Sequence, residues 1–416
     1  MLLNVLGLFC CCVISRYFSE PSFYLHRMTK LTNLFLNRAQ HVMKYLGVWV
    51  PNESDTIYRK LYKIFMLSLQ YTFLLFQMIF VVQAWGDLEA VADAVYLLFT
   101  QASLCCKIAI FHINIEGVRE LCQKMNNEVF RPTSVVHERI LQIRAKNIKR
   151  LLLCFIVAAE MICLAWGVAA LPLFDNGPRK FPFVMWMPVN SDSSPQYEIG
   201  FLFQELTIST SAMMYYGVDS VAFSMVIFAC AQMEIIMEKI LSIESRNDAL
   251  LKNYASLTKH YFNGNKILIE CVKHYQAVIT FKELVENTFH IYMFFQLTGT
   301  VGIIVMSAFR ILVVKSERFQ FISTIIYVIV MVSQIYLCCW CGHELTATNE
   351  KLHRVLYMSL WYEQDVKFQR ALCFMMARTQ RPLVLRAGHY ISLSRQTFVA
   401  ILRMSYSYIA VLNQTM

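Results

Sequence analysis

Residues 64–85 read IFMLSLQYTFLLFQMIFVVQAW, a run of 22 residues without a charged side chain. A helix needs roughly 20 apolar residues to cross the hydrocarbon core of a bilayer, which is about 30 Å thick. This run therefore predicts a membrane-spanning helix. The whole chain agrees, because 57% of its 416 residues are hydrophobic and only 16% are charged, whereas soluble domains carry about 25% charged residues.

Six further apolar segments follow the first one. The fourth span is long enough to extend beyond the membrane, and the last contains Arg395 and Arg403 and is the least hydrophobic. We therefore predict an all-α membrane protein with seven transmembrane helices. The six segments are residues 91–111, 151–174, 199–233, 288–309, 321–341 and 391–412.

The basic residues between these spans predict the orientation. Residues 1–63, 112–150, 234–287 and 342–390 together hold 30 Lys and Arg side chains, whereas the three alternate loops hold five. Loops rich in Lys and Arg stay in the cytosol. We expect a cytosolic N-terminus and an extracellular C-terminus, which is inverted relative to G-protein-coupled receptors.

The first fourteen residues, MLLNVLGLFCCCVI, are too short to span a membrane. They could form a signal peptide, but its cleavage would export the basic residues near the first span. Met28 is an alternative start, because an amphipathic pattern begins there.

No catalytic motif is visible, so we predict neither an enzyme nor a cofactor. The net charge of +10 is spread between apolar stretches, which argues against nucleic-acid binding. Cys338, Cys339, Cys341 and His343 fit no tetrahedral metal site, so we interpret them as packing residues and predict no metal site.

Charged residues inside spans are functional hypotheses, because each is costly unless it is paired or hydrated. Lys107 lies near the end of its span, and we expect it to extend to the inner interface. For Glu160 and Asp219, a structural hydrogen bond and a functional role both remain open.

The last span has a polar stripe at helical spacing. If several subunits place this face around an axis, it lines a water-filled path that narrows at Val411 and carries a ring of Gln414 amides. Alternatively, the stripe packs inside a monomeric bundle. The stripe consists of Gln396, Ala400, Arg403, Ser407, Val411 and Gln414.

Aromatic residues and methionines are frequent in the outer halves of the spans, where apolar walls with a few hydroxyls suit volatile or lipophilic ligands. Ordinary packing is the alternative. The candidate ligand-binding residues are Tyr96, Phe99, Trp166, Met213 and Tyr216.

Four stretches resemble the insect odorant receptor family, of the odour-tuning kind, over nearly the whole length from Met28. They are FPFVMWMP (181–188) with SPQYE (194–198), GVDSVAFSMVIFACAQMEI (217–235), LIECVKHYQAVITF (268–281) and SYIAVLNQT (407–415). The last is similar to the C-terminal signature of gustatory receptors, with Ser407 replacing Thr, Asn413 interrupting the hydrophobic run and Thr415 replacing Phe.

The resemblance implies a subunit of a tetrameric, odorant-gated, non-selective cation channel in the plasma membrane of olfactory neuron dendrites. It implies small volatile ligands. The long insertion that the shared co-receptor carries between spans four and five is absent, so the resemblance implies a tuning subunit that assembles with the co-receptor as its partner. It places the gate at Val411 and the filter at Gln414 and Thr415, with Arg403 and Ser407 lining the pore.

The alternatives to this function are a G-protein-coupled seven-helix receptor and a gustatory-type channel.

The predicted organisation has six parts. The parts are the cytosolic N-terminal segment (1–63), spans one to four with the ligand-binding region (64–233), cytosolic anchor helices (234–287), spans five and six (288–341), the anchor part of span seven (342–390) and the pore-lining helix (391–416).

Overall fold

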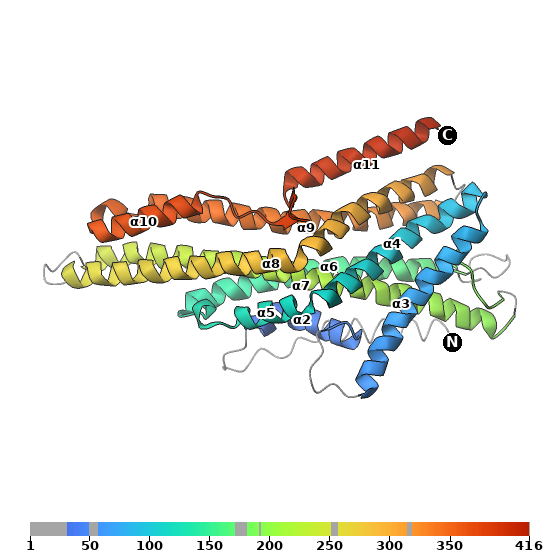
Figure 1. Cartoon of the computed structure of the whole chain (residues 1–416), viewed down its shortest axis with the longest axis horizontal. Helices are drawn as coiled ribbons and strands as arrows, with labels where there is room; N and C mark the ends of the chain where they lie inside the picture. Colours follow the sequence, from blue (N-terminus) through green and yellow to red (C-terminus); the bar gives the residue numbers. More distant parts are fainter. Residues whose placement is uncertain are drawn as a thin grey trace.

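A computed structural model describes residues 31–49, 57–170, 181–190, 193–250, 257–313 and 318–415. These residues are almost entirely helical (Figure 1). The first thirty residues, which include Met28, lie outside the described part. The helices are α2 (Leu31–Tyr45), α3 (Ile57–Gln83), α4 (Leu88–Ile113), α5 (Ile115–Met125), α6 (Val135–Ala169), α7 (Gln196–Leu250), α8 (Leu257–Val313), α9 (Arg318–Met358), α10 (Val366–Thr379) and α11 (Arg395–Thr415).

Six of the described helices are long and apolar enough to cross a membrane, namely α3, α4, α6, α7, α8 and α9. They contain the first six predicted spans with two exceptions. Helix α3 ends at Gln83, two residues before the predicted end of the first span. Helix α6 ends at Ala169, and residues 171–174 of the third span lie outside the described part. Helix α11, which contains most of the predicted seventh span, is long enough but not apolar enough to be counted with them, because its arginines and other polar residues lower its hydropathy.

The predicted start of the seventh span, at residue 391, is wrong. Ile391–Ser392 form strand β2, which pairs antiparallel with strand β1 (Arg386–Ala387). Helix α11 begins only at Arg395, where the hydroxyl of Ser394 accepts a hydrogen bond from the Thr397 amide at 3.1 Å. A side-chain oxygen just before a helix satisfies an otherwise unpaired N–H group, so the helix starts after this short hairpin.

Three helices are much longer than a bilayer is thick. With 55, 57 and 41 residues, α7, α8 and α9 extend about 80, 85 and 60 Å at 1.5 Å per residue. The hydrocarbon core accounts for about 30 Å of each. Each helix therefore continues well beyond the membrane without a break, and α10 packs against the extended parts of α8 and α9.

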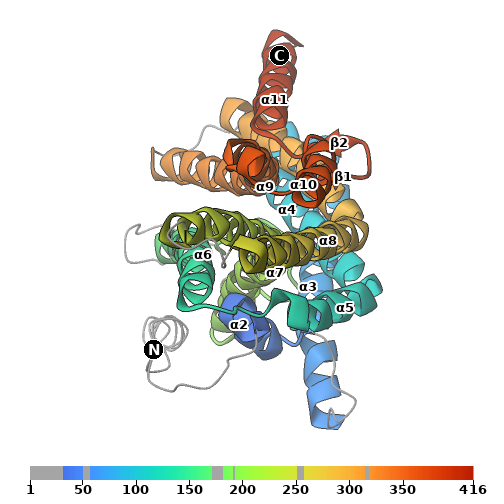
Figure 2. The same cartoon turned by 90° about the vertical axis from the view of Figure 1, so that its left-hand side faces the viewer.

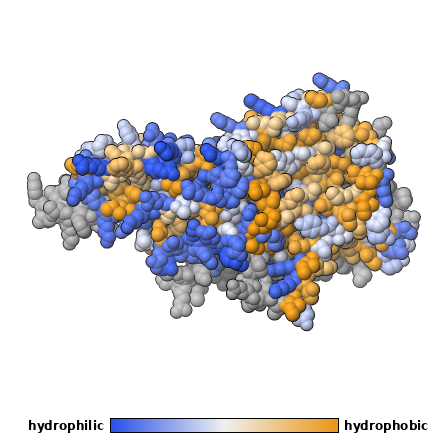
Figure 3. Space-filling model, viewed as in Figure 1, coloured by the Kyte–Doolittle hydropathy of each residue, from blue (hydrophilic) through white to orange (hydrophobic). Residues whose placement is uncertain are grey.

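The surface divides along the long axis of the molecule. On the face seen in Figure 3, hydrophobic residues predominate over the half that contains α3, α4 and α11, and hydrophilic residues predominate over the half that contains α10. An apolar surface of this extent is expected where lipid is the solvent. The division indicates one membrane-embedded half and one half in water.

Helix α7 forms the centre of the bundle, and it packs against α2, α6, α8 and α9. By contrast, α11 lies at one edge, where it contacts α8 and α9 (Figure 2). Few side chains of α11 are buried, so most of this helix faces away from its own subunit.

Candidate functional site

An aromatic cluster occupies the membrane-embedded half of the bundle. It joins Tyr96 of α4, Trp166 of α6, Phe183 of the segment 181–190 and Tyr327 of α9. The ring centroids are 5.7 Å apart for Tyr96 and Tyr327, 5.5 Å for Trp166 and Tyr327, and 5.6 Å for Trp166 and Phe183. Aromatic rings at such separations attract each other when the edge of one meets the face of the next.

Polar groups border this cluster at a few points. The hydroxyls of Thr100 and Tyr327 share a hydrogen bond, and the Arg310 guanidinium lies 4.8 Å from the centre of the Tyr96 ring. Arg310 is itself paired with Asp93, to which its Nε donates at 2.6 Å. Apolar walls with a small number of placed polar groups are typical of small-molecule sites.

The five predicted ligand residues do not lie together. Tyr96 and Trp166 belong to the aromatic cluster. Phe99 is 40% exposed, and Met213 and Tyr216 are buried in the larger hydrophobic core around α7. The pattern did not single out Tyr327, because nothing in a sequence shows which side chain of α9 faces Tyr96 of α4.

Asp219 and Lys107 form an ion pair inside the bundle. Both side chains are almost completely buried, and Lys107 Nζ lies 3.5 Å from Asp219 Oδ1. Gln334 of α9 donates to the other oxygen of Asp219, and the Lys107 ammonium lies 4.1 Å from the centre of the Tyr215 ring. The expectation that Lys107 extends to the inner interface is wrong, because the side chain points into the interface between α4 and α7.

A layer of amides and hydroxyls joins α3, α4 and α7. Gln70 Oε1 accepts hydrogen bonds from Gln101 Nε2 at 2.7 Å and from Ser211 Oγ at 2.6 Å, and Gln70 Nε2 donates to Thr210 Oγ1 at 2.9 Å. Hydrogen bonds of this kind hold helices together in lipid, where no water competes for them. The sequence analysis did not predict this layer.

Helix α11 has one buried and one exposed side. Ile401 and Ser405 are 6% and 2% exposed, and Phe398 packs edge-to-face on Tyr336 of α9 with ring centroids 5.3 Å apart. Every residue of the predicted polar stripe is exposed in the single subunit: Gln396, Ala400, Arg403, Ser407, Val411 and Gln414. The stripe is therefore not packed inside the bundle of its own subunit.

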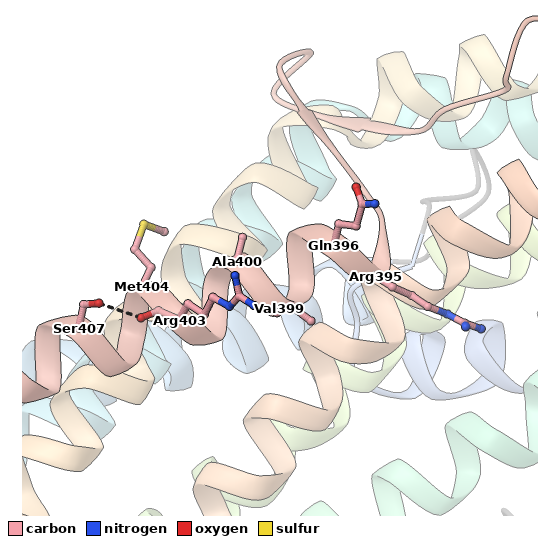
Figure 4. Close-up of a pocket in the computed structure, with 7 residues that line it drawn as sticks. All are labelled: Arg395, Gln396, Val399, Ala400, Arg403, Met404 and Ser407. Atoms are coloured by element: carbon pink, nitrogen blue, oxygen red, sulfur yellow. Dashed lines mark hydrogen bonds between the residues drawn. The ribbon is translucent and has the colours of Figure 1, made fainter.

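An open groove of about 610 Å³ follows this exposed side (Figure 4). Within it the Ser407 hydroxyl donates to the Arg403 carbonyl at 3.1 Å. Val411 lies further toward the C-terminus and is 58% exposed. The groove is lined by Arg395, Gln396, Val399, Ala400, Arg403, Met404 and Ser407. Thr415 ends the helix, and its side chain lies outside the described part.

A charged network holds the hydrophilic half together. Arg144 of α6 donates to Glu234 of α7 at 2.5 and 3.0 Å and to Glu344 of α9 at 2.8 Å. Each of the three side chains is only about one-fifth exposed. A guanidinium that binds two carboxylates fixes the relative position of three helices, where they continue beyond the apolar part of the bundle.

These features define a multi-pass helical membrane protein, with an aromatic cluster inside the bundle and a polar face on its last described helix. The model of the family described as 7tm odorant receptor matches residues 87–406. The chain belongs to this odorant receptor family, which is a family of receptors and not of enzymes.

The similarity to known members covers nearly the whole chain. Odorant receptor Or1 of Anopheles gambiae is 24% identical over 89% of this chain and 93% of its own length. Odorant receptor 46a, isoform A, of Drosophila melanogaster is 22% identical over 93% and 99%. The fold matches that of the insect olfactory receptor OR5 from Machilis hrabei in complex with eugenol, with a TM-score of 0.75 and 14% identity over 92% of this chain and 98% of OR5.

Proposed function

We propose that this chain is the odour-binding subunit of an odorant-gated, non-selective cation channel, and that α11 lines the pore. The observation that supports this most strongly is the two-sided burial of α11. Its apolar side packs on α8 and α9, while the polar stripe faces away from the subunit. A polar face in lipid needs protein partners or water, and a ring of such helices provides both.

Charge and surface together support the proposed orientation. The segments rich in Lys and Arg include residues 342–390, and α10 within them lies in the hydrophilic half. Basic segments stay in the cytosol, so that half is cytosolic, with the N-terminus inside and the C-terminus outside. The long inner parts of α7, α8 and α9, with α10, then form the anchor through which subunits join.

The aromatic cluster is the proposed site for a small volatile ligand. OR5 of Machilis hrabei was solved with eugenol, an aromatic phenol that would suit rings such as those of Tyr96 and Trp166. Phe99, Met213 and Tyr216 stay predictions as ligand residues. Binding that spreads the helices around this cluster would move α9 through Tyr327, and α11 with it, because α11 packs on α9.

A single α11 cannot enclose a pore, so the channel needs several subunits. We propose a heterotetramer with the shared co-receptor, in the dendritic plasma membrane of olfactory neurons. Val411 then forms the gate, and Gln414 with Thr415 the filter, near the outer mouth. Arg403 and Ser407 line the path below them.

We expect an odour panel to evoke current in cells that express this chain with the co-receptor. The current should begin within seconds of application, and it should persist when a non-hydrolysable GDP analogue in the pipette blocks G-proteins, because the channel itself carries it. The measurement is whole-cell recording of the same cells with and without the analogue, with cells expressing the co-receptor alone as the control.

Loss of the response under the analogue would contradict the channel and favour a G-protein-coupled receptor. Labelling of an N-terminal tag in intact cells would support the same alternative, since it would place the N-terminus outside. Responses confined to sugars and bitter compounds would instead indicate a gustatory-type channel.

A further inference from the structure

Two carboxyl groups inside the membrane-embedded half have no basic partner among the residues that the structure describes. Glu160 of α6 and Glu205 of α7 are 6% and 1% exposed. Glu160 lies nine residues before the end of α6, and Glu205 lies nine residues after the start of α7. Both are therefore about 14 Å from the nearest helix end, well inside the apolar part of the bundle.

The two carboxyl groups share one helix interface. Ser209, one turn after Glu205 on α7, donates to Glu160 Oε2 at 2.7 Å. Gly167, two turns after Glu160 on α6, makes room for Glu205, because a Cβ at this glycine would lie 2.7 Å from Glu205 Oε2. The α6 and α7 backbones thus form a cradle in which both carboxyl groups lie.

Most of the carboxyl oxygens in this cradle are unpartnered. Glu160 Oε1 and both oxygens of Glu205 are buried and make no hydrogen bond to any described residue. A buried polar group without a partner costs about 1–3 kcal/mol, and a charged one costs more. An arrangement of three such oxygens is understandable if a further group binds there.

Two other acids of the described spans show the contrast. The buried Asp219 is paired with Lys107, and the partly exposed Asp93 is paired with Arg310. No ion pair reaches Glu160 or Glu205 within the described residues. Since carboxylates in a bilayer normally pair with a cation, a positively charged group of a bound ligand would complete this arrangement.

Apolar and aromatic side chains border the cradle. Cys163 lies one turn after Glu160, and Ile208 lies one turn after Glu205 and next to Ser209. Both belong to the aromatic cluster with Trp166 and Tyr327. A molecule with a positive head in the cradle would therefore place an apolar tail among these rings. This combination matches an organic amine.

We propose that Glu160 and Glu205 bind the ammonium group of an amine ligand, whose apolar part lies against the aromatic cluster. The proposal deepens the proposed function and rests on it for its electrical readout. Simple alkylamines have a pKa similar to that of a lysine side chain, about 10.4, so they carry the required charge at neutral pH.

The test compares amines with alcohols of the same skeleton. Cells that express this chain with the co-receptor are exposed to 2-phenylethylamine and 2-phenylethanol, and to hexylamine and hexanol. In the wild type the amines should act at lower concentration than the alcohols. Glu205→Gln should raise the half-maximal amine concentration about tenfold or more, because it removes one partner of a buried charge pair, and leave the alcohols unchanged.

Three variants make this comparison specific. Glu205→Asp keeps the charge and should keep the amine preference. Gly167→Ala should weaken it, because the added methyl group occupies the space of the Glu205 carboxyl. Glu89→Gln removes an exposed carboxyl at the start of α4 and should change nothing.

The same amines and alcohols are also tested for their effect on the melting temperature of the purified full chain, a measurement that does not depend on channel activity. Amine stabilisation that disappears in Glu205→Gln would support the site even if no current is seen, so that only the channel proposal would fail. The proposal is overturned if amines are not preferred over their alcohols in the wild type, or if the preference survives in the Glu160→Gln/Glu205→Gln double variant. Thermal stabilisation of the purified chain by sodium that disappears in Glu205→Gln, without an amine preference, would instead assign the cradle to an inorganic cation.

Discussion

Lys107→Met is expected to remove most folded receptor from the cell surface. The variant leaves Asp219 buried beside Gln334 without its cation. Removing one partner of a buried ion pair costs about 3–5 kcal/mol, which is a large part of the stability of a typical protein domain. The measurement is surface biotinylation, together with the melting temperature of the solubilised receptor.

Two comparisons isolate this effect. Lys124→Met breaks an exposed pair with Glu120 on α5, in which the side chains are 36% and 50% exposed, and such pairs contribute at most about 1 kcal/mol. The double variant Lys107→Met/Asp219→Asn removes both charges and should recover much of the surface expression. Normal expression of Lys107→Met alone would contradict the role given to the pair.

Val411→Ala is expected to raise the resting current of the co-expressed channel. Val411 belongs to the exposed stripe of α11 and is 58% exposed in the single subunit. A hydrophobic constriction closes a pore by excluding water, and a smaller side chain widens it. The measurement is the leak current before odorant, relative to the maximal odorant current of the same cell.

Val399→Ala is the matched control for this variant. It makes the same substitution at another exposed valine of α11, about 120° further round the helix at 3.6 residues per turn. Its resting current should equal that of the wild type. An unchanged leak in Val411→Ala, or an equal increase in both variants, would count against the gate at Val411.

Hydropathy was sufficient to predict six of the membrane helices, because a charge-free run such as residues 64–85 has few alternatives to a span. It did not predict how far these helices continue. Within the described residues, the basic segment 234–287 forms the end of α7 and the beginning of α8 without a break. Hydropathy does not show this, because it does not distinguish a polar helix in water from a polar loop.

At the candidate site, features within one helix could be predicted from the sequence, whereas contacts between helices could not. The polar stripe of α11 follows from helical periodicity, and the structure leaves all six of its residues exposed. The Lys107–Asp219 pair joins residues 112 positions apart, and the contact of Tyr96 with Tyr327 depends on how α4 packs against α9. Such pairings depend on the rotation of whole helices, which periodicity within one helix does not determine. The strand at Ile391 was missed because two paired residues are too few to produce a pattern.

The central claim is that the polar face of α11 lines the path of the ions, and two serines of this helix test it directly. Ser407 is exposed on the stripe, whereas Ser405 is 2% exposed on the opposite side, about 200° round the helix. Each is replaced by cysteine, and a positively charged methanethiosulfonate reagent is applied during odorant-evoked current, with the wild type as control for its native cysteines. We expect the reagent to reduce the current of Ser407→Cys channels and to leave Ser405→Cys channels at the wild-type level. An unchanged current in Ser407→Cys, or block only in Ser405→Cys, would contradict the claim.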